Sequence, residues 1–258
     1  MYTDTHCHLG LLESATADAA VARAREAGVT TLVDVGIDLA SSAEAVSTAA
    51  SLEGVWAAVG IHPNSAIEAT EHVLQRLRAL AQHPHVVGIG ETGLDFFRQH
   101  SPPVRQEESF REHIRLAKEL DKALIIHDRD AHDAVVAILD DERAPERTVF
   151  HCFSGGLDLV RTCAERGWFL SFAGNVTFRN APELREAAAA APLELLVAET
   201  DSPFLSPHPH RGRPNEPARV SLVVEQLAAL HDRDPADMAA LTSANARRLF
   251  ALPEPQSS

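Results

Sequence analysis

The chain alternates short β-branched runs with amphipathic, alanine-rich stretches along nearly its whole length, and no other feature constrains its fold as strongly. The runs typical of strands are Tyr2–Leu9, Thr30–Ile37, Val55–His62, Val86–Glu91, Ala123–His127, Thr148–Cys152, Trp168–Ala173 and Leu195–Thr200. The stretches typical of helices are Ala17–Ala27, Ser41–Ser51, Ile67–Ala81, Arg105–Leu120, Ala131–Leu139, Leu157–Arg166, Pro182–Ala190, Pro217–Leu230 and Pro235–Leu249. Strands that alternate with helices form parallel α/β sheets. Eight such units in 258 residues predict an α/β fold, a closed (β/α)8 TIM barrel with an additional C-terminal helix.

One domain is expected to contain almost the entire chain. Barrels of this kind are built from about 250 residues, and no internal repeat or low-complexity linker interrupts the sequence. We therefore predict a single-domain barrel over residues 1–252 and a flexible, proline-containing tail over residues 253–258.

The composition indicates a cytoplasmic protein. No stretch approaches the roughly 18 consecutive apolar residues of a membrane span, and the N-terminus lacks the basic and apolar regions of a secretory signal. The three cysteines, Cys7, Cys152 and Cys163, are an odd number and do not suggest a disulfide framework. We expect free thiols, no membrane partner and a monomer, although the sequence leaves the oligomeric state open.

The net charge restricts the kinds of partner that the protein can bind. It is −14, with a sequence pI near 5.4. Non-specific binding to a nucleic-acid duplex depends on many lysine and arginine contacts to phosphates, so a broad basic binding face is excluded. A polyanionic substrate would have to be held by metal ions and a few local arginines.

Residues of metal-binding type recur where the predicted strands end. His6 and His8 point the same way because side chains alternate along a strand. In a (β/α)8 barrel the C-terminal ends of all strands meet on one face, where the active site is built. A single His-x-His pair among 14 histidines could arise by chance. The set at the strand ends is larger and consists of His6, His8, Glu91, His127, His151 and Asp201.

Four imidazoles and two carboxylates exceed the needs of one tetrahedral zinc ion, which takes three or four protein ligands. They suit two divalent cations about 3.5–4 Å apart that share a carboxylate, for which Glu91 is the natural candidate. Only two lysines, Lys118 and Lys122, are present, and their predicted positions keep both away from this face. A bridging modified lysine is therefore disfavoured. The ligand types alone do not identify the ions, and Mg, Mn and Zn all remain candidates.

The motifs around these residues resemble the TatD family of metal-dependent deoxyribonucleases, within the amidohydrolase-like metallohydrolases. The resemblance follows family order over nearly the whole chain. Its segments are 4–8 (DTHCH), 59–63 (VGIHP), 90–95 (GETGLD), 126–131 (IHDRDA), 151–155 (HCFSG), 199–203 (ETDSP), 211–217 (RGRPNEP) and 245–250 (NARRLF). One departure is the segment 120–123 (LDKA), where the family usually has a Leu-Pro step.

The resemblance implies a role for each of the predicted ligands. One metal ion would be bound by His6, His8, Glu91 and Asp201, and the other by Glu91, His127 and His151. It also implies 3′–5′ exonuclease activity on single-stranded DNA with a metal-activated water. The residues expected to act in catalysis are Asp201, Glu91 and His62. From spacing alone, His62 could equally serve as a cap beside Pro63, and the resemblance favours a role in the site.

Four further residues are expected to contact the substrate or to support the site. Arg129 shares the direction of His127 and could clamp a phosphoryl oxygen, or it could pair with nearby carboxylates. Glu199 shares a face with Asp201 and could orient a ligand or a water. Arg179 and Arg211 belong to loops near the expected catalytic rim, where the alternative is a solvated loop.

Two other functions remain open at this point. The nearer is a binuclear metallohydrolase for small phosphoesters or amides, which the net charge of −14 favours because a small substrate needs no basic track. The more distant is a non-catalytic barrel that binds a metal or a partner. The intact set of six ligand-type residues argues against the second.

Overall fold

The computed structural model of the protein describes residues 1–13, 15–98 and 100–253 and confirms the predicted (β/α)8 barrel. Its strands are β1 Tyr2–Cys7, β2 Val29–Val35, β3 Val55–Val59, β4 Val86–Asp95, β5 Ala123–Arg129, β6 Thr148–Phe150, β7 Phe169–Phe172 and β8 Leu196–Ala198. Its helices are α1 Ala17–Glu26, α2 Leu39–Ser51, α3 Glu71–Ala81, α4 Pro103–Glu119, α5 His132–Glu142, α6 Leu157–Arg166, α7 Pro182–Ala190, α8 Val220–Leu230 and α9 Pro235–Phe250. Of the predicted tail, residues 254–258 lie outside the described residues.

The strands form one parallel sheet in sequence order, from β1 to β8. Backbone hydrogen bonds between β1 and the segment after β8 close the barrel. Asp201 N–H donates to the His6 carbonyl (2.9 Å), and His8 N–H donates to the Ser202 carbonyl (2.8 Å). The closing strands therefore bring two predicted ligand segments from opposite ends of the sequence into direct contact.

A buried carboxylate adds to this closure. Asp4 accepts hydrogen bonds from the Thr200 backbone N–H (2.9 Å) and from the Thr200 hydroxyl (2.6 Å). The Thr5 hydroxyl donates to the Ala198 carbonyl (3.0 Å). Because these groups are buried, their hydrogen bonds are required to offset the loss of contact with water.

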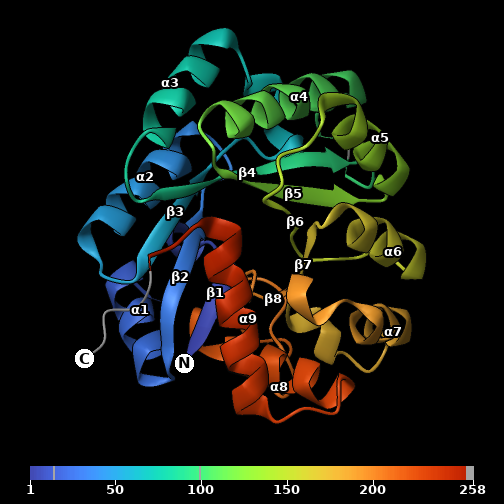
Figure 1. Cartoon of the computed structure of the whole chain (residues 1–258). Helices are drawn as coiled ribbons and strands as arrows, with labels where there is room; N and C mark the ends of the chain where they lie inside the picture. Colours follow the sequence, from blue (N-terminus) through green and yellow to red (C-terminus); the bar gives the residue numbers. More distant parts are fainter. Residues whose placement is uncertain (14, 99, 254–258) are drawn as a thin grey trace.

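The helices surround the sheet, with α8 and α9 beside β1 (Figure 1). Their apolar sides pack on the outer faces of the strands, and the core is continuous through the barrel. Asn245 of α9 is almost fully buried and donates to the Leu193 and Leu196 carbonyls (2.7 and 2.8 Å). This hydrogen bonding fixes the last helix against the start of β8.

Some predicted helix boundaries were wrong. Pro63–Glu68 is a separate 3-10 helix, and α3 begins only after Thr70, whose side chain accepts from Val73 N–H. The predicted helix over 217–230 is divided into a 3-10 turn, Pro217–Arg219, and α8. In both segments the pattern of apolar residues continues across the helix boundary, which is set by local hydrogen bonds.

β4 is longer than predicted, because glycines allow its second half to stay next to β5. Gly93 pairs with His127 and has φ +139°. A Cβ atom at this position would lie 2.1 Å from the His127 carbonyl oxygen. Only glycine therefore permits the strand to continue past Glu91 toward Asp95 at this spacing.

The two lysines, Lys118 and Lys122, are both held by backbone carbonyl groups. Lys118 donates to the Glu142 carbonyl and Lys122 to the Val86 carbonyl at the start of β4, both at 2.6 Å. Lys122 is thus held at the N-terminal end of the strands, and Lys118 at the C-terminal end of α5. Within the described residues, no helix combines the length and apolar character needed to cross a bilayer.

Candidate metal centre

The six predicted ligands meet at the C-terminal ends of the strands. β1 and the residue after it supply the first two histidines, β4 supplies Glu91, and β5 supplies His127. His151 directly follows β6, and Asp201 lies in the segment after β8. The residues gathered in this way are His6, His8, Glu91, His127, His151 and Asp201.

Glu91 lies at the centre of the cluster, and its two oxygens face different histidine pairs. Oε2 lies 3.4 Å from His6 Nε2 and 3.8 Å from His8 Nε2. Oε1 lies 2.6 Å from His127 Nδ1 and 2.8 Å from His151 Nε2. Glu91 therefore offers a carboxylate oxygen to histidines on both sides of the cluster.

Asp201 adds a carboxylate to the first of these pairs. Its Oδ1 lies 3.5 Å from His8 Nε2, and His6 Nε2 lies 3.2 Å from the same His8 nitrogen. These three side chains can offer ligand atoms within 4.8 Å of one another. Two imidazole nitrogens and a carboxylate oxygen form a donor set that suits a divalent metal ion.

Two of the imidazoles are oriented by acceptors behind them. His8 Nδ1 donates to the Val35 carbonyl (2.7 Å), and His151 Nδ1 faces Glu199 Oε1 (3.3 Å). Both rings therefore direct Nε2 toward the cluster. Metal-binding histidines are commonly fixed in this way through the second ring nitrogen.

Glu199 lies behind His151 and is completely buried. Its Oε1 also accepts from Cys152 N–H (2.7 Å), and its Oε2 accepts from the Ser171 hydroxyl (2.5 Å). Three donors thus occupy the lone pairs of this carboxylate. Its position favours the predicted role of orienting a ligand over direct contact with substrate.

Asp95 plays the corresponding role for His127. Its Oδ2 lies 3.4 Å from His127 Nε2 and accepts from Asn64 Nδ2 (3.0 Å). Its Oδ1 accepts from the N–H groups of Phe97 (3.0 Å) and Arg98 (2.8 Å). Burial opposes ionisation, but these hydrogen bonds hold the pKa of Asp95 well below its usual range.

His62 has the position of a hydrogen-bond donor. Its Nδ1 accepts from Asn64 N–H (3.0 Å), so the ring proton resides on Nε2, which lies 3.4 Å from Glu91 Oε1. Burial lowers the pKa of His62 to about 4, and the neutral form therefore predominates at neutral pH. This tautomer offers an N–H group to the cluster, whereas a metal ligand must offer a lone pair.

The carboxylates of the site lie next to imidazoles, which can carry positive charge. In the part of the chain that the structure describes, their ion-pair partners are the imidazoles: Glu91 faces five of them, and Asp95, Glu199 and Asp201 each face one.

The pKa shifts of His8 and His6 reflect their burial and their charged neighbours. Burial opposes protonation, but contact with Asp201 and the charge of Glu91 raise the pKa of His8 to about 9. Burial and the neighbouring His151 lower the pKa of His6, whose buried Nδ1 has no hydrogen-bond partner among the described residues. The donor set and its excess of buried carboxylate fit divalent cations.

The three arginines predicted to bind substrate lie at or near the rim. Among the described residues Arg129 forms no ion pair with a neighbouring carboxylate, and its guanidinium lies 4.0 Å from the centre of the Phe97 ring. Arg211 lies 4.1 Å from the Phe178 ring centre and donates to Asn180 Oδ1 (3.1 Å). Arg179 is exposed on the loop after β7.

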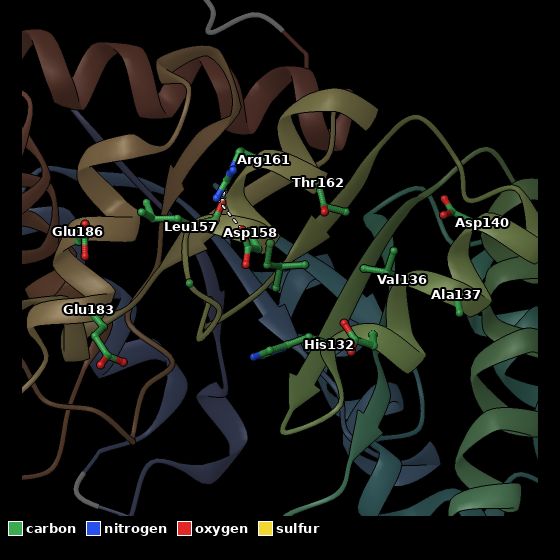
Figure 2. Close-up of a pocket in the computed structure, with 13 residues that line it drawn as sticks. His132, Val136, Ala137, Asp140, Leu157, Asp158, Arg161, Thr162, Glu183 and Glu186 are labelled. Carbon is green, nitrogen blue, oxygen red and sulfur yellow. Dashed lines mark hydrogen bonds and ion pairs between the residues drawn. The ribbon is translucent and has the colours of Figure 1, made fainter.

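A groove of about 840 Å³ lies elsewhere, between α5, α6 and α7 (Figure 2). Asp158 and Arg161 form an ion pair in it (2.6 Å), with Glu183 and Glu186 on the neighbouring helix. None of the six predicted ligands lines it. Because acidic side chains dominate its lining, it is unsuited to phosphate groups.

Known proteins match this chain over nearly its full length. The family model described as TatD related DNase matches residues 3–251. An uncharacterized metal-dependent hydrolase, TatD, from Mycobacterium tuberculosis is 42% identical over 257 residues, covering 96% of this chain and 97% of that protein. The 3′-5′ ssDNA/RNA exonuclease TatD of Cronobacter sakazakii is 40% identical over 240 residues, covering 90% and 91%.

A solved structure supports the same assignment. The crystal structure of YJJV, a TatD homologue from Escherichia coli K12, superposes with a TM-score of 0.92 at 30% identity and covers 98% of both chains. With the barrel, the clustered histidines and carboxylates, and matches over nearly the full length, the chain belongs to the TatD family of metal-dependent hydrolases.

Proposed function

We propose that this protein is a 3′–5′ exonuclease that hydrolyses phosphodiester bonds of single-stranded DNA with two divalent cations. The observation that carries the proposal is the division of the Glu91 oxygens between two histidine pairs. The polarity and the substrate are supported by relatives about 40% identical that are named 3′-5′ ssDNA/RNA exonucleases.

The cations would be held by the residues already grouped around Glu91. One would lie among His6, His8 and Asp201, the other between His127 and His151, and Glu91 would contact both. When bound, divalent cations at such a site lower the pKa of water and stabilise negative charge on the attacking and leaving oxygens.

The protein's own side chains supply positioning and proton transfer. Asp201 is partly exposed, so its carboxylate can orient an incoming water and accept a proton from it. His62, in its neutral form, can donate from Nε2 to a phosphoryl oxygen. Glu199 and Asp95 keep His151 and His127 in the orientations that this arrangement requires.

The proposal is tested by mapping products from 5′-labelled single- and double-stranded DNA with chelator-treated and metal-reconstituted protein. We expect a ladder that shortens from the 3′ end of the single strand and depends on added metal. Products formed equally without metal, or shortening from the 5′ end, would contradict the proposal. Metal analysis of the purified protein would identify the bound ions.

A hydrolase for small phosphoesters or amides is the second candidate, and the net charge of −14 favours it. The same metal centre could act on either class of substrate. The two functions are distinguished by comparing the turnover of three substrates by one preparation: a labelled oligonucleotide, a chromogenic phosphodiester and a chromogenic amide. Efficient cleavage confined to the small substrates would favour this alternative.

A further inference from the structure

Exposed large apolar side chains are concentrated on the face of the barrel that carries the candidate metal centre. Apart from Met1, each of those found in the described residues lies on a segment that follows the C-terminal end of a strand. They are Leu11, Ile67, Phe97, Val104, Leu157 and Phe204. Single exposed apolar residues are common on protein surfaces. Two of these six, Phe97 and Phe204, are aromatic and lie next to residues of the candidate metal centre.

Phe204 stands beside the first half of the metal centre. Its side chain is 52% exposed, and its ring centre lies 6.2 Å from that of His8. Its backbone is held at both ends, because Phe204 N–H donates to the Asp201 carbonyl (2.9 Å) and buried Asn215 donates to the Phe204 carbonyl (2.7 Å). The ring is thus presented outward from a fixed backbone.

Phe97 stands beside the second half in a comparable way. It is 62% exposed, and the Arg129 guanidinium lies 4.0 Å from its ring centre. Its N–H donates to Asp95, the carboxylate that also faces His127. The register of β4 and β5 places Asp95 opposite Arg129, so the sheet itself positions this aromatic–cation pair.

We propose that Phe204 and the Phe97–Arg129 pair are stacking platforms for the bases of a single-stranded nucleic acid, one beside each half of the metal centre. The inference rests on the proposed nuclease function and adds the residues that hold the bases. Every base has a π-face, so aromatic platforms bind single strands without regard to sequence.

The combination of rings and arginines favours a nucleic acid over a protein partner. Arg129 lies on Phe97, and Arg211 repeats the arrangement on Phe178 at 4.1 Å. A guanidinium stacked on a ring can bind a phosphate at its edge while the ring contacts a base. In a chain of net charge −14, such local cations can attract a polyanion that the rest of the surface would repel.

The test measures binding by metal-reconstituted protein of short single-stranded oligonucleotides with uncleavable phosphorothioate linkages. We expect Phe204→Ala and Phe97→Ala each to weaken binding by about 5- to 150-fold, the range for one lost base–aromatic contact. Phe204→Tyr should retain the wild-type affinity. Leu157→Ala is the matched control, because Leu157 is an exposed apolar residue that lines the acidic groove of Figure 2.

An oligonucleotide of the same length with abasic sites near its 3′ end separates stacking from phosphate binding. Wild-type protein should bind it about as weakly as a Phe97→Ala/Phe204→Ala double variant binds the oligonucleotide with bases, and the double variant should not discriminate the two oligonucleotides. Equal affinity of wild-type, Phe204→Ala and Phe97→Ala proteins for the oligonucleotide with bases would overturn the inference.

The two proposals fail in different ways. If wild-type protein binds the oligonucleotide through both phenylalanines but does not cleave an unmodified one, only the nuclease function is contradicted. Metal-dependent cleavage that is indifferent to both phenylalanines would contradict the platforms alone. Absence of any oligonucleotide binding by wild-type protein would overturn the platforms and point to a protein partner for the exposed rings.

Discussion

Replacing Glu199 by glutamine removes one negative charge behind His151 and leaves the shape of the side chain nearly unchanged. The amide oxygen can keep the contacts that Oε1 makes with Cys152 N–H (2.7 Å) and His151 Nδ1 (3.3 Å). The new amide group can donate to Ser171, whose hydroxyl lies 3.0 Å from Thr5 Oγ1 and can turn toward it. We therefore expect the free energy of unfolding to change by less than about 1 kcal/mol.

The affinity for metal should change more than the stability does. A carboxylate that accepts from a metal-binding histidine makes the imidazole a better ligand, and its loss costs about 10- to 100-fold in metal affinity. That range corresponds to about 1.4–2.7 kcal/mol. Glu199→Ala behaves differently because it leaves three buried donors unsatisfied, which costs about 3 kcal/mol or more of stability.

Titration calorimetry of chelator-treated protein with Mn²⁺ or Zn²⁺ measures the affinity, and thermal unfolding measures the stability. Glu194→Gln makes the same charge change on an exposed residue five positions earlier and serves as the control. Wild-type metal affinity in a folded Glu199→Gln variant would refute the orienting role assigned to this carboxylate.

Four further outcomes are expected. Glu91→Ala should abolish metal-dependent turnover with a barrel-like circular dichroism spectrum, and retained activity would exclude a central role for Glu91. A cation at about 100 times its Kd should stabilise the protein by about 2.7 kcal/mol, and an unchanged melting temperature would argue against a built site. Burial lowers the pKa of His113, whose Nε2 accepts a hydrogen bond from Ile61 N–H. As the pH falls below 6.5, His113 is therefore protonated in the unfolded chain before it is protonated in the folded protein, and the folded protein loses stability. Denaturant titrations should therefore show wild-type stability falling more than that of His113→Gln between pH 7 and about 5. The logarithm of the association constant for single-stranded DNA should fall with the logarithm of salt concentration with a slope of about −2, which corresponds to about three phosphate contacts. A much steeper slope would require a basic binding face.

The order of strands and helices could be predicted because hydrophobic periodicity records which residues are buried. The exact ends could not, because they depend on individual hydrogen bonds. Thr70 caps α3 with its side chain and so separates it from Pro63–Glu68, although the pattern of apolar residues runs through both. Gly93 lets β4 continue beside His127, an effect of backbone clearance that periodicity does not register.

The members of the metal centre could be predicted because parallel strands of a barrel end on one face, and ligand-type residues at those ends are easily recognised. Their orientations could not. The partner of His8 Nδ1 is the Val35 carbonyl, and a main-chain acceptor leaves no trace in residue type. The contact of Asp95 with His127 could not be predicted either, because it depends on the register of β4 with β5.

The acidic net charge and the proposed substrate are compatible if the cations themselves attract the substrate. Glu91, Asp95, Glu199 and Asp201 place four carboxylates at the barrel mouth, and their described ion-pair partners are histidines. Without cations this region repels phosphate, and the net charge of −14 adds to the repulsion. Two divalent cations bound among these carboxylates would place positive charge at the proposed site of hydrolysis. A duplex would then gain little from the rest of the surface, whereas a single-stranded end could reach the cations with its phosphate and the exposed rings with its bases. Binding of nucleic acid should accordingly require the same cations that cleavage requires, and this dependence follows from the charge distribution of the chain.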